Sequence, residues 1–130
     1  MAELTTVLQK IDAEAGVAWL TFNRPEKKKA MSQKFMAELV TALKELAEND
    51  KIKCIVTTGS GDSYSSGLDL YDLRESWKRK RAWDHAGTTY EIVRVLRNMP
   101  QVTVAAVRGW CLGGGLALIN GHDLCIAAES

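Results

Sequence analysis

Apolar and polar positions along the chain follow two periods, one typical of strands and one typical of helices. Short apolar or β-branched runs predict strands, and a glycine between the first two runs predicts a hairpin. Longer segments in which apolar residues recur every three or four positions predict helices. The expected strands cover residues 5–11, 17–22, 52–58, 102–107 and 123–128. The expected helices cover residues 32–49 and 88–99, a segment that starts at 68–70 and continues through 75–81, and a short piece around 116–119. Strands that alternate with helices of this length favour an α/β domain with right-handed crossovers.

The two longest expected helices each have a clear apolar face and a clear boundary. Ser32 is a good N-cap for the first, and Pro100 ends the second because proline cannot continue a helix. Both faces are predicted to pack inward. Their members are Phe35, Met36, Leu39, Leu43 and Leu46 in the first helix and Ile92, Val95, Leu96 and Met99 in the second.

Two glycine-rich turns carry the candidate chemistry. Residues 109–121 read GWCLGGGLALING and follow the strand at 102–107, while residues 59–67 read GSGDSYSSG and follow the strand at 52–58. Glycines at the start of a helix let another molecule approach the backbone, and the first helical amides have no intrahelical partner. Such amides suit an oxygen that is negative or becomes negative. If the two preceding strands are parallel neighbours, both turns lie at one edge of the sheet and their amides converge there.

Other interpretations of the glycines remain open at this point. Glycines between a strand and a helix can simply allow tight packing. The triplet at 113–115 also resembles a dinucleotide-binding fingerprint, but it lies far down the chain, and no acidic residue about twenty positions later can be checked before Ser130.

Composition narrows the class of protein. At 130 residues with 46% hydrophobic content, the chain is long enough for one domain with a real core. Lys and Arg number 17 against 16 Asp and Glu, so charge gives no overall attraction to nucleic acid or to an anionic membrane. No apolar run approaches the ~20 residues of a membrane helix, and the N-terminus lacks the pattern of a secretory signal. Cys54, Cys111 and Cys125 are interpreted as buried free thiols in a reducing, cytoplasmic compartment, not as disulfides or metal ligands, and we expect no metal site.

Several motifs together resemble one known family. They are NRPEK at 23–27, AM at 30–31, SGLDL at 66–70, GWCLGGG at 109–115 and DL at 123–124. In this order they resemble the enoyl-CoA hydratase/isomerase (crotonase) superfamily, and the likeness spans nearly the whole chain. Within it, the chain is most similar to hydroxycinnamoyl-CoA (feruloyl-CoA) hydratase-lyases. The resemblance implies a crotonase-like (ClpP/crotonase) ββα superhelix, with residues 1–130 as its N-terminal, acyl-CoA-binding part and a second half missing.

The resemblance also implies a site. The backbone N–H groups of Leu68 and Gly114 would form an oxyanion hole that binds the thioester carbonyl of an acyl-CoA and stabilises its enolate. No separate cofactor is implied, since coenzyme A enters as part of the substrate, and full-length members assemble as homotrimers or dimers of trimers. Tyr71 is a candidate hydrogen-bond partner for a phenolic substrate. The other residues that the resemblance places near the substrate or CoA are Lys27, Lys28, Ser66, Gly67, Asp69, Leu70, Trp110, Gly113 and Ala117.

One position departs from the hydratase pattern. Hydratases of the family use two glutamates, and the first of them corresponds here to Ala117, which can neither donate nor accept a proton. Water addition by two glutamates is therefore disfavoured, whereas isomerases, lyases and dehalogenase-like enzymes remain open. The second acid/base residue would lie beyond Ser130. His122 and Asp123 are interpreted as helix-end residues, and His85 as a surface histidine.

A rival class rests on residues 77–83, which read WKRKRAW. Basic groups flanked by aromatic rings are typical of single-stranded RNA binding, although a solvated helix face explains them as well. A catalytically inactive or RNA-binding homologue, or an assembly module, is the alternative to an enzyme.

Overall fold

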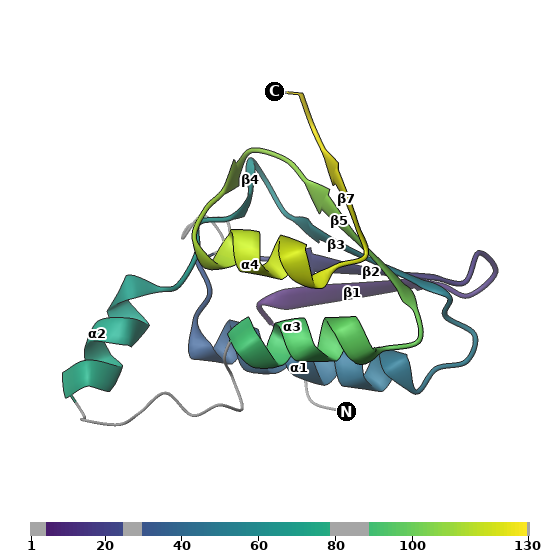
Figure 1. Ribbon diagram of the computed structural model, residues 1–130, viewed down its shortest axis with the longest axis horizontal. Coiled ribbons are helices and arrows are strands. Elements are labelled where there is room, and N and C mark those ends of the chain that lie inside the picture. The colour runs from purple at the N-terminus through teal and green to yellow at the C-terminus, as the bar shows by residue number, and fades with distance from the viewer. Residues whose placement is uncertain (1–4, 25–29, 79–88, 130) are drawn as a thin grey trace.

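The structure is a computed structural model that describes residues 5–24, 30–78 and 89–129 (Figure 1). The elements, in chain order, are β1 (Val7–Asp12), β2 (Val17–Phe22), α1 (Gln33–Ala47), β3 (Cys54–Gly59), β4 (Ser63–Ser65), α2 (Leu70–Lys78), α3 (Thr89–Asn98), β5 (Val102–Val107), β6 (Trp110–Cys111), α4 (Gly114–Gly121) and β7 (Leu124–Ala127).

Five strands form the main sheet in the order β1-β2-β3-β5-β7. The β1–β2 pair is antiparallel, which confirms the predicted hairpin, and every other neighbouring pair is parallel. Because β3 and β5 are parallel neighbours, their carboxyl ends lie at one edge of the sheet. The glycine turns that follow these two strands therefore start from the same edge of the sheet. The sequence analysis made this arrangement conditional on the two strands being parallel neighbours, and they are.

The core lies between the sheet and the helices that pack on it. Helix α1 packs beside α3, and α3 beside α4, whereas α2 projects away from the sheet (Figure 1). The apolar face predicted for α1 is buried in full. In α3, Ile92 and Leu96 are buried, while Val95, and Met99 directly after the helix, pack half-buried against the core. The predicted inward faces are thus confirmed.

Local contacts explain where α1 begins and how β1 is attached to it. The Ser32 hydroxyl accepts a hydrogen bond from Phe35 N at 3.1 Å, which confirms the predicted N-cap. Glu38 is buried on α1, and its carboxylate accepts hydrogen bonds from the backbone and hydroxyl groups of Thr5 and Thr6. Burial works to raise the pKa of Glu38, but these hydrogen bonds outweigh it and hold the pKa below its ordinary value.

The structure corrects the turn predicted at 59–67. Residues 63–65 form β4, which pairs in parallel with β6 to make a second, two-stranded sheet. All of β4 is buried, including the Tyr64 ring, which packs edge-on to Phe22 with 5.0 Å between ring centroids. The sequence did not predict this strand, because two of its three residues are serines and its burial comes from tertiary contacts.

The cysteine prediction is corrected in part. All three cysteines are free, but Cys125 is exposed, while Cys54 and Cys111 are half-buried. Strand β7 lies at the edge of the main sheet, and all four of its residues are exposed. An edge strand has a neighbour on only one side, so an apolar pattern alone does not bury it. Burial raises the pKa of the Cys54 and Cys111 thiols.

Some predicted features lie outside the described residues. They are Lys27, Lys28, His85 and most of the basic stretch at 77–83. Across the described ranges, every helix is too short or too polar to span a bilayer.

Candidate active site at the two glycine turns

The first turn presents the amide of Leu68. After β4, Gly67 has a positive φ of 99°, and its carbonyl accepts a hydrogen bond from Met31 N at 2.7 Å. The Met31 carbonyl in turn accepts from Asp69 N at 3.0 Å, so Met31 and Leu68 form a parallel bridge. In such a bridge the bonds run to the residues on either side of Leu68, and the N–H and C=O of Leu68 itself point away from Met31. No acceptor for the Leu68 N–H is found among the described residues.

The second turn presents the amide of Gly114. Gly113 occupies the N-cap of α4 with φ 52°, and it offers no side chain to the helix amides. The next two amides are paired within the turn: Gly115 N donates to Leu112 O at 2.9 Å, and Leu116 N donates to Gly113 O at 3.0 Å. The Gly114 N–H has no such acceptor within the described chain. It lies at the partly positive end of the helix, where unpaired amides attract negative charge.

The two turns lie in contact with each other. Leu112 N donates to Ser65 O at 2.9 Å, which joins the start of α4 to the end of β4. A methyl group added to Gly67 would lie 3.4 Å from Gly114 N, and one added to Gly114 would lie 3.8 Å from Leu68 N and would overlap the end of the Met31 side chain. Glycine at these two positions keeps the backbone of both turns accessible to a ligand.

One cavity of about 610 Å³ opens between the turns. The structure brings together here eight of the residues predicted from the sequence, and adds Ala30 and Leu73. Its lining residues are Ala30, Ser66, Gly67, Leu68, Asp69, Leu70, Tyr71, Leu73, Gly113 and Gly114. Leu70 and Tyr71 are largely exposed at the start of α2 and give the cavity an apolar and aromatic rim.

Two of the predicted residues are not part of this lining. Trp110 is exposed on β6, and Ala117 is half-buried on α4, three residues after Gly114. The sequence analysis did not predict Ala30 and Leu73 as lining residues. Ala30 belongs to the AM motif at 30–31. Leu73 lies one helical turn after Leu70, so helical spacing could have indicated it.

Asp69 fixes the cavity wall through its side chain. One carboxylate oxygen accepts from the amides of Tyr71 and Asp72 at 3.0 and 3.3 Å, and thereby caps the first turn of α2. The other accepts from the Arg24 guanidinium at 3.1 Å. Arg24 also donates to Ala30 O, so its guanidinium links Ala30 to Asp69, the residue after Leu68. Burial works to raise the pKa of Asp69, but its hydrogen bonds and the Arg24 charge outweigh it and lower the pKa.

The chemistry that the lining offers is therefore mainly main-chain chemistry. Asp69 is the carboxylate among the described lining residues, and it is already engaged by Arg24 and by the amides of α2. The two amides, by contrast, have no acceptor among the described residues and face one cavity. This arrangement can hold an oxygen that gains negative charge.

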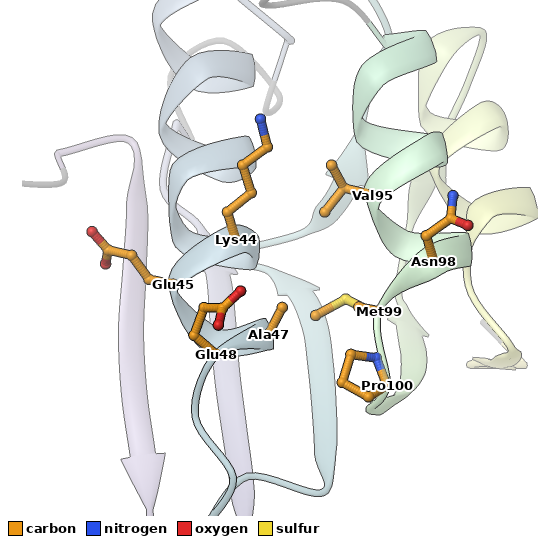
Figure 2. Close-up of a pocket in the computed structure, with 8 residues that line it drawn as sticks. All are labelled: Lys44, Glu45, Ala47, Glu48, Val95, Asn98, Met99 and Pro100. Atoms are coloured by element: carbon orange, nitrogen blue, oxygen red, sulfur yellow. The ribbon is translucent and has the colours of Figure 1, made fainter.

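A larger cavity of about 710 Å³ lies elsewhere, in the groove between α1 and α3 (Figure 2). Figure 2 shows Val95 of α3 opposite Lys44 of α1, and Met99, just after α3, opposite Ala47. Lys44 at its margin is already paired with Glu91 at 3.0 Å. The groove lies at the C-terminal ends of both helices and is lined by none of the predicted site residues. Volume alone therefore favours this groove, but the two amides without acceptors among the described residues favour the smaller cavity as the functional site.

Comparison with known proteins defines the class and then the family. Solved structures of an enoyl-CoA hydratase/isomerase from Xanthobacter autotrophicus Py2 and an enoyl-CoA hydratase from Shewanella pealeana ATCC 700345 match 98% and 96% of this chain, with TM-scores of 0.78 and 0.82 at 29% and 25% identity. The chain covers 47% of each of them. The fold is that of the crotonase class, as predicted.

The family model described as enoyl-CoA hydratase/isomerase matches residues 12–130, and the chain belongs to this family. It is 31% identical to a hydroxycinnamoyl-CoA hydratase-lyase of Pseudomonas fluorescens over 92% of its length, and 36% identical to a 1,2-epoxyphenylacetyl-CoA isomerase of Escherichia coli (strain K12) over 90%. These matches cover 45% and 46% of the two relatives, so the chain spans less than half of their length.

Proposed function

We propose that the chain binds an acyl-CoA thioester with its carbonyl oxygen between the amides of Leu68 and Gly114, and that these amides stabilise the thioester enolate. The observation that carries this proposal is the pair of amides without acceptors on one cavity. Membership of a family of acyl-CoA enzymes supplies the substrate class.

The two amides would act on the enolate that forms during the reaction. Its oxygen carries far more negative charge than the ground-state carbonyl, so fixed donors favour the anion over the bound substrate. Removing one such donor from an enzyme typically costs on the order of 3–4 kcal/mol of transition-state stabilisation. Two donors therefore account for a large share of a rate acceleration without help from any side chain of the cavity.

The reaction type is proposed from what α4 lacks. Ala117 offers no carboxylate to handle water, which favours a lyase or isomerase over hydration by two glutamates. Relatives with both of the favoured activities in their names match this chain. Lys27 and Lys28 lie outside the described residues, and we propose from the family resemblance that they bind the CoA phosphates. We also propose a homotrimer as the assembly of the whole protein.

The decisive test compares two ligands that differ by one oxygen. Acetyl-CoA carries the thioester carbonyl, and S-ethyl-CoA replaces it with a methylene group. Since two ground-state hydrogen bonds of about 0.5–1.5 kcal/mol each are lost in S-ethyl-CoA, we expect acetyl-CoA to bind about 5- to 150-fold more tightly by calorimetry. Equal affinities would contradict the proposal, and binding of neither ligand would favour an inactive homologue.

A variant pair assigns the preference to one amide. Proline is well tolerated at the first position of a helix, so Gly114→Pro removes this N–H with little other change to α4. Its ring would collide with the end of Met31, and we therefore make it in a Met31→Leu background. The Met31→Leu protein is the control: it should keep the preference for acetyl-CoA, and the double variant should lose most of it.

A further inference from the structure

A chain of three side chains joins the elements that carry the two turns. The Tyr64 hydroxyl on β4 lies 2.8 Å from Thr57 Oγ1 on β3, and the same Oγ1 lies 2.8 Å from Nε2 of His122. The other ring nitrogen of His122, Nδ1, lies 2.6 Å from Leu118 O in the last turn of α4. Tyr64 and Thr57 are fully buried, and His122 is the C-cap of α4.

The chemistry of these groups fixes the direction of every bond. A carbonyl oxygen only accepts, so Nδ1 of His122 carries a proton and donates it to Leu118 O. In the neutral ring Nε2 is then an acceptor, and the Thr57 hydroxyl donates to it. The Thr57 oxygen in turn accepts from the Tyr64 hydroxyl. Each of the three protons has one acceptor, and the chain is complete only while His122 is neutral.

Adding a proton to His122 breaks this pattern. Nε2–H then also needs an acceptor, and the Thr57 oxygen accepts from both the imidazolium and Tyr64. The Thr57 proton is left without a partner in this buried network, which is costly where water is excluded. Burial lowers the pKa of His122, in keeping with a ring that is held neutral.

The network acts on both turns through the elements that bear them. Strand β4 ends three residues before Leu68, and α4 begins at Gly114 and ends next to His122. Helix α4 has eight residues, so it is about 12 Å long. Because the helix is that short, a displacement of about 1 Å at the His122 end rotates the Gly114 end by roughly 5° relative to β4. The hydrogen bond from Leu112 N to Ser65 O secures the Gly114 end, and the bonds of Arg97 to Asn120 O and of Thr103 to Asp123 also hold the His122 end.

We propose that Tyr64, Thr57 and His122 form a positioning relay, which holds the amides of Leu68 and Gly114 aligned on one thioester oxygen and releases that alignment when His122 takes up a proton. The inference rests on the proposed function, because it concerns the alignment of the same two amides. None of the three side chains lines the cavity, so they act through β4 and α4 and not on the substrate.

The other charged and titratable groups near the His122 ring do not replace this switch. Asp123 follows it in sequence, and its charge works to raise the pKa of His122, but burial outweighs this effect. Its carboxylate accepts from the amide and hydroxyl of Thr103 on β5. From α3, Arg97 donates to Asn120 O just before the helix end. Tyr64 is the titratable group of β4, and burial raises its pKa, so it stays protonated.

The test uses cinnamoyl-CoA, a conjugated thioester without an ionisable group on its ring. Hydrogen bonds to its carbonyl favour the excited state, in which charge moves onto that oxygen, so aligned donors shift its absorbance to longer wavelength. The shift is measured at saturating protein from about pH 8 down to the lowest pH at which the chain stays folded, because the pKa of His122 lies below its ordinary value. We expect the wild-type shift to diminish as the pH falls.

Three variants separate alignment from simple packing. Thr57→Val keeps the shape but removes the hydroxyl, and it should lose most of the red shift at every pH while free CoA binds within about twofold of wild type. Thr57→Ser restores the hydroxyl and should restore both the shift and its pH dependence. Thr58→Val is the matched control, since it makes the same change at the next residue of β3, and it should behave as wild type.

A measurement on the unmodified protein covers the case in which Thr57→Val does not fold. The ¹⁵N chemical shifts of the His122 ring report the tautomer, and we expect Nδ1 to carry the proton. An Nε2–H tautomer overturns the relay. So does a Thr57→Val protein with the wild-type red shift and pH profile. No red shift in wild-type protein that still binds CoA is a different result: it removes the proposed function, and the relay with it.

Discussion

The attachment of Arg24 to Asp69 gives a prediction whose size follows from the structure. The Asp69 carboxylate does two separable things, since one oxygen caps α2 and the other pairs with Arg24 at 3.1 Å. The two side chains are only 12% and 15% exposed. Asp69→Ala removes both roles, whereas Asp69→Asn keeps an oxygen for the cap and removes only the charge.

The two variants should differ in stability by the free energy that the N-cap of α2 contributes. Loss of an N-cap typically costs about 1 kcal/mol. Removing one partner of a fully buried ion pair costs about 3–5 kcal/mol, and we take about 2 kcal/mol here because Arg24 keeps Ala30 O as an acceptor and some contact with solvent. Asp69→Ala should therefore lower the free energy of unfolding by about 3 kcal/mol, and Asp69→Asn by about 2 kcal/mol.

Urea unfolding at neutral pH measures both values, with an unchanged m-value as the sign that only stability has moved. Asp72→Asn is the matched control, because its carboxylate lies on the helix that Asp69 caps and, among the described residues, accepts only the exposed Gln33 amide at 2.9 Å. It should cost less than about 1 kcal/mol. An Asp69→Asn protein as stable as wild type would refute the reasoning about the ion pair, and one as unstable as Asp69→Ala would refute the reasoning about the cap.

The stability of the protein at low pH provides a second test of the role of Asp69. The pKa of Asp69 is lower in the folded chain than in the unfolded chain. Its stabilisation is therefore complete above the unfolded pKa of about 3.9 and is lost as the pH falls through the folded value. The Asp69→Asn protein should show a shallower loss of stability in this range than wild type.

Three further predictions concern other parts of the fold. Glu38→Gln replaces a carboxylate that accepts charge-assisted bonds from the start of β1, and urea unfolding should show a loss of about 1.5–3 kcal/mol. Gly109→Ala should give little folded protein by circular dichroism, because φ is 68° and a methyl group would overlap Asp62 O; a normal spectrum would show that this turn adapts. Since burial lowers the pKa of His122, the unfolded chain binds the proton more readily, and the free energy of unfolding should fall as the pH drops from about 6.5 to the folded pKa. His122→Asn should remove this part of the pH dependence, and a parallel slope in both proteins would assign it to other groups.

Local sequence predicted much of the fold because its signals are local. The apolar spacing in α1 and α3, the Ser32 cap and the hairpin before Phe22 each depend on neighbours within a few residues, and each appears in the structure as expected. Membership of the crotonase superfamily was also predictable, because its motifs are short and keep their order.

Strand β4 and the exposure of Cys125 escaped prediction for the opposite reason. A run of serines around Tyr64 becomes a buried strand only because β6, far along the chain, pairs with it. Cys125 looks like a core residue in sequence, but the order of the strands places β7 at an edge. Neither property exists within a window of ten residues.

The candidate site divides in the same way. By itself the sequence determined that two glycine turns follow two strands, since glycine is the residue that tolerates a positive φ and a close backbone approach. The tertiary structure decided that β3 and β5 are neighbours, that Gly67 and Gly114 touch, and that Arg24 pairs with Asp69 and Thr57 with His122. Such contacts join residues dozens of positions apart, and only the packing of the whole chain brings them within the reach of a hydrogen bond.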